Sequence, residues 1–257
     1  MFKSFTPPHT ASGRSALVVP PPWHYAGWLI NVAFEFDAAL AASLVPAAVG
    51  RALGRGCIHF ADWQATTDGS ELLDPVQAQY RETIVVLAIE RPDGSHCNLC
   101  PAIWVDQDVS LLRGLLQGWP KKLGSTWLTR SLPLDHPAAA PLKAGTRLGA
   151  SLAVKDRRVV EAQLRLTGAA GQALGFLAAP TLGAAGLPDL RQPGRLPDVH
   201  LLRADVAQPM ASTWHGATAT LQVFEHPREE LASLGALHTV DASVGWFGLT
   251  VEGALDA

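Results

Sequence analysis

A succession of apolar and β-branched runs, separated by segments rich in glycine, proline and polar residues, most constrains the fold of this chain. Runs of this composition and length are typical of strands. They cover Trp28–Phe36, Cys57–Thr66, Glu82–Ile89, Asn98–Val105, Ser125–Leu132, Arg147–Val154, Val159–Leu166, Val199–Val206, Ala217–Phe224 and His238–Leu249. The sequence therefore predicts a mainly β (α+β) protein whose strands are mainly antiparallel.

Helical patterns are few and short. They predict helices at Ala38–Val45 with Asp37 as the N-cap, at Ser110–Leu116 and at Arg228–Leu234. Two further stretches, Pro133–Leu142 and Pro180–Pro197, are so rich in proline, alanine and glycine that we expect long loops there.

Composition fits one soluble enzyme-sized body. The chain has 257 residues, 48% of them hydrophobic, so it can bury a substantial core, and we expect a single domain over residues 1–257. Charged residues make up only 17%, which leaves less polar cover for the surface, and we expect a homo-oligomer that buries apolar surface between subunits. The net charge is -3 and there is no basic cluster, so nucleic acid is excluded as a partner.

The N-terminal region carries no recognisable targeting segment. Residues 1–14 lack the apolar core of a signal peptide. The longest apolar stretch, Ala16–Phe36, is interrupted by three successive prolines, so it does not read as a membrane span. We therefore expect a cytoplasmic protein with no membrane partner.

Three cysteines, Cys57, Cys97 and Cys100, cannot all pair, which fits a reducing compartment. Cys97 and Cys100 form a CxxC pattern beside His96, a pattern that metal and redox sites use. No second CxxC and no histidine-rich segment accompanies it, and the residues that follow resemble a buried strand. We therefore expect no metal site here.

The segment Trp119-Pro120-Lys121-Lys122-Leu123-Gly124 places two adjacent lysines in apolar, conformationally restricted sequence. Taken alone, such a pair is more often a solvated turn. A lysine must be neutral to act as a nucleophile, and with an ordinary pKa of about 10.4 it is almost never neutral at pH 7. Burial and a neighbouring cation both favour the neutral amine. We expect Trp119, Pro120 and Leu123 to supply an apolar wall around Lys121.

Strand periodicity refines this interpretation. If the segment is extended, Lys121 and Lys122 point to opposite faces. Burial rather than the charge of Lys122 is then the main cause of a lowered Lys121 pKa, and Lys122 contributes electrostatics or structure. Gln117, Trp119 and Lys121 then share a face. These three residues are the predicted nucleus of the site.

Glu82 is the second candidate. Alternation places it on one face with Tyr80 and Ile84, and both faces of the run are apolar, so a carboxyl group enters a strand that looks buried. A buried carboxyl can transfer protons near neutral pH, whereas an exposed strand end is the ordinary alternative. Tyr80 is predicted either to hydrogen-bond a substrate or to pack at the strand mouth.

The lysine segment closely resembles the Schiff-base segment of the acetoacetate decarboxylase-like superfamily. Three weaker matches accompany it. Pro20–Tyr25 and Leu29–Phe36 resemble the family's N-terminal aromatic segment and first strand, and Tyr80–Glu82 resembles its tyrosine-any-glutamate motif. Thr220–His226 resembles its late strand, which ends in an acidic residue followed by histidine. Acetoacetate decarboxylase itself is the established example of a lysine activated by a neighbouring cation. The resemblance implies an antiparallel β-barrel or cone with a few short helices, imine chemistry without a cofactor, and Tyr25 in the substrate site.

The departures from that family concern the substrate carboxylate. Where decarboxylases carry an arginine after the aromatic segment, this chain has Gly27 and Trp28, and Ala61 replaces a second glutamate, with Asp62 on the opposite face. The Gly-Arg-Glu before the lysine motif becomes Leu112–Leu115. The chain resembles instead the branch that forms a lysine imine with pyruvate-like 2-oxo acids and carries out aldol addition and dehydration.

On this interpretation Lys121 forms the imine, Glu82 moves the proton, Gln117 holds the carboxylate and Trp119 excludes water. The expected partners are a small oxo acid and an aldehyde. Two alternatives stay open: an acetoacetate decarboxylase in which Arg81 or Arg113 receives the carboxylate, and a small-ligand-binding barrel that kept the lysine without turnover.

Overall fold

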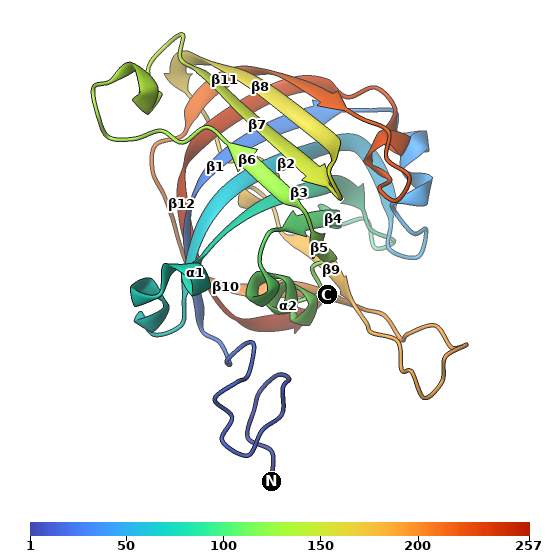
Figure 1. The fold of residues 1–257 in the computed structure, drawn as a ribbon. Coiled ribbons are helices and arrows are strands. Elements are labelled where there is room, and N and C mark those ends of the chain that lie inside the picture. Colours follow the sequence, from blue (N-terminus) through green and yellow to red (C-terminus); the bar gives the residue numbers. More distant parts are fainter.

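The computed structural model describes residues 1–257, and one twelve-stranded sheet that closes on itself dominates it (Figure 1). The strands are β1 (Trp23–Glu35), β2 (Arg51–Thr66), β3 (Gln79–Glu90), β4 (His96–Val105), β5 (Lys121–Leu123), β6 (Ser125–Leu128), β7 (Arg147–Val154), β8 (Arg157–Ala170), β9 (Thr181–Ala185), β10 (His200–Ala211), β11 (His215–Val223) and β12 (His238–Asp256). The order β1-β2-β3-β4-β9-β10-β12 forms a ring, because β12 pairs back onto β1. The predicted mainly β fold with a barrel is confirmed.

The long strand β12 joins the ring to a second layer. Besides β1 and β10 it pairs with β11, and the sheet continues through β8, β7 and β6. This extension lies across β1, β2 and β3 in Figure 1. The three strands are therefore covered on both faces in their middle, where each has a run of consecutive buried residues: 27–32 in β1, 57–61 in β2 and 82–87 in β3.

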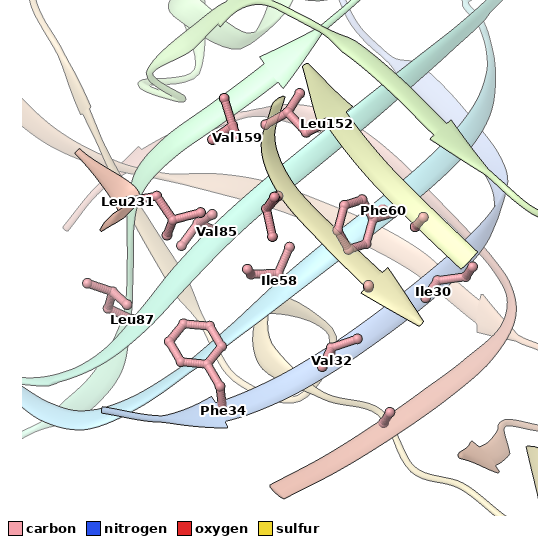
Figure 2. Packing of buried hydrophobic residues seen from close by; sticks show 14 of the residues in the cluster. Ile30, Val32, Phe34, Ile58, Phe60, Val85, Leu87, Leu152, Val159 and Leu231 are labelled. Atoms are coloured by element: carbon pink, nitrogen blue, oxygen red, sulfur yellow. The ribbon is translucent and has the colours of Figure 1, made fainter. Parts of the chain in front are cut away.

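The two faces of β1–β3 have different functions. One face packs against the extension in a cluster of 29 buried residues (Figure 2), which includes Ile30, Phe60 and Val85. The other face lines the inside of the ring, where smaller apolar clusters surround polar side chains such as Asn31 and Glu82. The site is on this inner face.

Helices are short and connect strands. They are α1 (Pro75–Ala78), α2 (Asp108–Leu116) and the 3-10 turns η1 (Ala38–Ser43), η2 (Ser70–Leu73), η3 (Pro137–Ala139), η4 (Gly175–Leu177) and η5 (Leu231–Leu234). The predicted N-cap is confirmed, since Asp37 Oδ1 accepts a hydrogen bond from Ala39 N at 3.0 Å. None of the helices has the length and hydrophobicity needed to span a bilayer.

Two sequence predictions need correction. The stretch Pro180–Pro197 was expected to be a loop, but Thr181–Ala185 forms β9, which pairs parallel with β4 and antiparallel with β10. Its glycine and alanines have low strand propensity, and the segment is a strand because it pairs with residues far away in the sequence. The strand expected at Ser125–Leu132 ends at Leu128. The sheet is mainly antiparallel, as expected, and its two parallel pairings join β4 to β9 and β4 to β5.

Candidate active site

Lys121 enters the ring from the turn that follows α2. Gln117 caps the helix and Gly118 turns the chain with φ of 84°, a left-handed conformation that favours glycine. The chain then pairs with β4 as β5, with Lys121 opposite Ile103. The Lys121 side chain is only 8% exposed, which excludes the solvated turn that a Lys-Lys pair ordinarily forms.

Two glycines make this arrangement possible. A Cβ at Gly114 would lie 2.2 Å from Lys121 Cδ, so the lysine passes α2 only because that helix carries no side chain there. A Cβ at Gly183 would lie 2.3 Å from Gly118 O, so β9 approaches the turn before the lysine only through a glycine. The two glycines thus allow Lys121 to pass close to α2, and allow β9 to pack against the turn that precedes Lys121.

Glu82 lies beside the amine. Lys121 Nζ and Glu82 Oε2 are 2.6 Å apart, and the Glu82 side chain is 5% exposed. The approach is poorly aligned for a hydrogen bond, and Nζ donates instead to Ser110 Oγ at 3.0 Å. Trp63 Nε1 donates to the other carboxylate oxygen at 3.1 Å, which orients the group. An amine, a carboxylate and an indole that orients the carboxylate therefore meet at one point.

Lys122 points to the other face, as strand periodicity predicts. Its ammonium pairs with the buried carboxylate of Glu229 and lies 5.3 Å from the centre of the Trp104 ring. Its charge is therefore already compensated outside the cavity. This placement favours the structural role for Lys122 over electrostatic support of Lys121.

The apolar wall is only partly the one expected. Trp119 lines the cavity, but Leu123 is 53% exposed and lies outside it. Trp63 contributes an aromatic surface that the lysine segment does not. A Cβ at Gly27 would lie 2.5 Å from Trp63 Cε3, so the indole occupies the space that a side chain at Gly27 would need. The absence of an arginine at that position is thus coupled to the presence of Trp63.

Both predicted tyrosines line the cavity. Burial raises the pKa of Tyr25 to about 12, although the neighbouring Arg113 charge opposes this shift. Burial, followed by the nearby Glu82 charge, raises the pKa of Tyr80 well above its usual value. Both phenols are therefore protonated at neutral pH and are available as hydrogen-bond donors.

Arg113 is a buried cation beside Tyr25. It is 5% exposed, its Nη2 lies 3.6 Å from Glu71 Oε1, and its Nε has no hydrogen-bond partner. Gln117 lines the cavity while its Nε2 donates to Arg113 O at 2.9 Å. Arg81, the other arginine considered, faces away: it pairs with Asp106 at 3.1 Å and lies over the Trp127 ring.

Sequence reasoning missed Ser110, Trp63 and, in part, Arg113. The signal for Ser110 and Arg113 was helical spacing: Ser110, Arg113, Gly114 and Gln117 occupy successive turns of one face of α2 and its cap. Trp63 shares the inner face of β2 with Ala61, opposite Tyr80 and Glu82 of β3. Only the strand pairing reveals that its indole reaches the carboxylate.

These residues surround a cavity of about 470 Å³. Fifteen of its 23 lining residues are hydrophobic, and Glu82 and the Tyr80 ring lie close to the Lys121 amine, so the cavity can bring together an amine, a carboxylate and two phenols away from bulk water. The cysteines take no part: Cys97 packs against the main cluster, whereas Cys100 lies in a separate cluster on the inner face.

Comparison with known proteins identifies the family of this chain. The family model described as acetoacetate decarboxylase (ADC) matches residues 5–255. A search of curated proteins gave no match.

Several solved structures superimpose on nearly the whole chain. The enduracididine biosynthesis enzyme MppR, complexed with the condensation product of pyruvate and imidazole 4-carboxaldehyde, has a TM-score of 0.90 at 27% identity, covering 100% of this chain and 97% of that one. The same enzyme complexed with pyruvate has a TM-score of 0.89 at 27% identity, covering 100% and 98%. An acetoacetate decarboxylase-like enzyme from Sphingomonas wittichii RW1, at 23% identity and TM-score 0.88 over 99% and 100% of the chains, shares the fold.

Proposed function

The chain belongs to the acetoacetate decarboxylase family, and from that premise we propose that it is a lyase that joins a pyruvate-like 2-oxo acid to an aldehyde through an imine of Lys121. The observation that carries the proposal is the 2.6 Å contact between Lys121 and Glu82 inside a mostly apolar cavity. The similarity to MppR, which has been solved with pyruvate and with a pyruvate–aldehyde condensation product, supports this choice of substrates.

The first step is formation of the imine. The resting amine is paired with a carboxylate, and an opposite charge favours the ammonium form. Glu82 is also the nearest acceptor for the proton that the amine must lose, and Ser110 Oγ holds Nζ during the transfer. The neutral amine attacks the ketone carbon of the oxo acid. The resulting carbinolamine takes the proton from Glu82 and loses water, which leaves a protonated imine.

The imine then acts as an electron sink. Glu82, again a carboxylate, removes a proton from the methyl group to give an enamine. The enamine carbon attacks the aldehyde carbon, and the aldehyde oxygen takes the proton that Glu82 had removed. Glu82 then removes a second proton from the former methyl carbon and returns it to the leaving hydroxyl, so that water departs and an unsaturated protonated imine remains. Hydrolysis consumes one water and releases Lys121, so the net products are an unsaturated 2-oxo acid and one water.

Three groups at one end of the cavity are suited to the substrate carboxylate. Tyr25 donates through its protonated phenol, and Gln117 lies beside it. Arg113 is buried beside Tyr25 and supplies a positive charge. It takes the place of the decarboxylase arginine, at whose position this chain has Gly27. This assignment extends the carboxylate role expected for Gln117 alone.

Intact-mass analysis after borohydride reduction tests the proposal. Wild type and Lys121→Ala are each treated with pyruvate or acetoacetate, and Lys122→Gln serves as a matched lysine control because its side chain lies outside the cavity. We expect a pyruvate adduct on wild type and on Lys122→Gln that is absent from Lys121→Ala.

The other outcomes identify the alternatives. An acetoacetate adduct that has lost carbon dioxide, without a pyruvate adduct, would indicate a 3-oxo acid decarboxylase. Tight binding of either acid with no adduct would indicate a ligand-binding barrel without turnover.

A further inference from the structure

The cavity extends well beyond the space that an acid as small as pyruvate needs. Its volume of about 470 Å³ lies in the range of pockets that hold drug-sized ligands. Glu82 and the Tyr80 ring lie close to the Lys121 amine. The remaining wall comes from the 3-10 turn η4, from β12 and from β10.

Aromatic and aliphatic side chains form this second wall. Phe176 of η4 lies 6.4 Å from Phe247 of β12, with the two rings at 78°. Leu177 and Leu249 also line the cavity. A further ring bound in the cavity can stack on, or meet edge-on, the aromatic side chains of this wall, because both arrangements are favourable for aromatic pairs.

The η4 turn is held rigidly by polar residues that the imine mechanism does not use. Asn98 Nδ2 donates to Gly175 O at 3.1 Å. A Cβ at Gly175 would lie 2.3 Å from His59 Nε2, so the turn rests directly on the His59 ring. Phe176 packs edge-on against the same ring, with a centroid distance of 4.5 Å.

His59 is itself fixed and uncharged. Its Nδ1 donates to Asn31 Oδ1 at 2.8 Å, and burial lowers its pKa to about 3. The ring beneath Phe176 is therefore neutral at physiological pH. Phe176 is thus held in place before any ligand arrives, which lowers the entropic cost of binding.

The second wall carries no net charge. The only ionisable residues that border it are Arg203 and Asp205 on β10, which have opposite signs and neither of which forms an ion pair within the chain. Arg203 is exposed and Asp205 is partly exposed, so water solvates both at the rim. The wall therefore selects for an apolar body rather than for an ion.

Resting on the proposed function, we propose that Phe176, Leu177, Phe247 and Leu249 form the subsite of the second reactant, and that this reactant is an aldehyde with a flat aromatic or otherwise apolar body. The aldehyde carbon would face the enamine on Lys121, and its body would lie against Phe176. Small hydrophilic aldehydes lack the surface to fill this space.

Condensation of pyruvate with benzaldehyde, followed by absorbance of the conjugated product, tests the subsite. In Phe176→Ala we expect the KM for benzaldehyde to rise about tenfold, the loss expected for removing one buried aromatic contact. The rate of pyruvate adduct formation under borohydride should stay within about twofold of wild type, because no contact to the amine changes. Phe176→Leu should be intermediate, and it serves as the test if Phe176→Ala does not fold. Phe5→Ala, in the N-terminal segment outside the cavity, is the matched control.

Two results would overturn the proposal while leaving the imine chemistry intact. One is an unchanged KM for benzaldehyde in both Phe176 variants. The other is a higher kcat/KM for glycolaldehyde than for benzaldehyde in wild type, with a normal pyruvate adduct. A wild type that forms no pyruvate adduct would overturn this proposal together with the proposed function, so the two failures are distinguishable.

Discussion

Two oxygen atoms from different elements hold the amine of Lys121. Glu82 Oε2 from β3 lies 2.6 Å away, and Ser110 Oγ from α2 lies 3.0 Å away. Once Glu82 has taken a proton, Ser110 is the remaining group that orients the nitrogen. In the proposed mechanism, Lys121 therefore depends on a residue outside its own segment.

Replacing Ser110 should slow imine formation without unfolding the protein. In Ser110→Ala we expect the rate of pyruvate adduct formation to fall about tenfold, the effect of losing one hydrogen bond to a reacting group. The temperature of unfolding should change little, and Ser125→Ala, an exposed serine, should behave as wild type. An unchanged rate would show that Glu82 alone positions the amine.

The two tyrosines give a spectroscopic measure of the site, because Tyr25 and Tyr80 are the only tyrosines in the chain. Burial raises the pKa of Tyr25 to about 12 and that of Tyr80 well above its usual value. We therefore expect the folded protein to show almost no phenolate absorbance at about pH 10, where an ordinary tyrosine is half ionised. Urea-unfolded protein should titrate normally.

The same shifts affect stability at high pH. Above about pH 10 the unfolded chain releases phenol protons that the folded chain retains, so stability falls as pH rises, by up to about 3 kcal/mol for Tyr25 alone. Ionisation of either phenol near pH 10 in folded protein would contradict the buried, protonated donors described here.

At the scale of elements, the packing of α2 against β5 determines where the lysine lies. One face of the helix carries Ser110, Arg113 and Gly114, and the lysine side chain passes over the glycine. Helix propensity alone would favour alanine over Gly114 by about 1 kcal/mol. The steric requirement of Lys121 opposes that preference.

Gly114→Ala should therefore impair chemistry more than stability. The added Cβ would lie 2.2 Å from Lys121 Cδ, which forces the lysine away from Glu82. We expect loss of the pyruvate adduct, with a stability change limited to about 1–3 kcal/mol because a flexible side chain can yield. Gly194→Ala, where nothing lies within 4 Å, is the control. Full adduct formation in Gly114→Ala would mean that the lysine reaches its site by another path.

At the scale of the whole molecule, the ring buries a histidine whose protonation opposes folding. His59 is fully buried, its Nε2 has no hydrogen-bond partner, and burial lowers its pKa to about 3. Below about pH 6.5 the unfolded chain binds a proton that the folded chain does not. Stability therefore falls as pH decreases from about 6.5 to about 3, by at most about 1.4 kcal/mol per pH unit from this group.

Urea unfolding at several pH values checks this dependence. In His59→Gln, whose amide does not titrate, the slope of unfolding free energy against pH should be smaller over that range. The decrease should be at most about 1.4 kcal/mol per pH unit, which corresponds to one proton. The variant is expected to be less stable near pH 7, because it disturbs the contact with Phe176. An unchanged slope would mean that other groups cause the loss of stability in acid.

Much of the site was predictable because it depends on local patterns. Alternation along β3 placed Tyr80 and Glu82 on one face, and the structure finds both lining the cavity. The same rule separated Lys121 from Lys122, which now lie on opposite faces of β5. Period-two patterns extend over only a few residues, so a single sequence is enough to read them.

The amino-acid sequence by itself thus determined the β class from the pattern of its apolar runs. The resemblance of its lysine segment to a known family, together with strand alternation, selected Lys121 and Glu82 as the candidate pair. The tertiary structure alone decided the rest: that Ser110 and Trp63 reach the Lys121–Glu82 pair, that Thr181–Ala185 is a strand, and that η4 completes the cavity. These features require residues far apart in sequence to meet, through the pairing of β4 with β5 and β9 and of β12 with β1. Such pairings are selected by the packing of the whole ring, which no local pattern encodes.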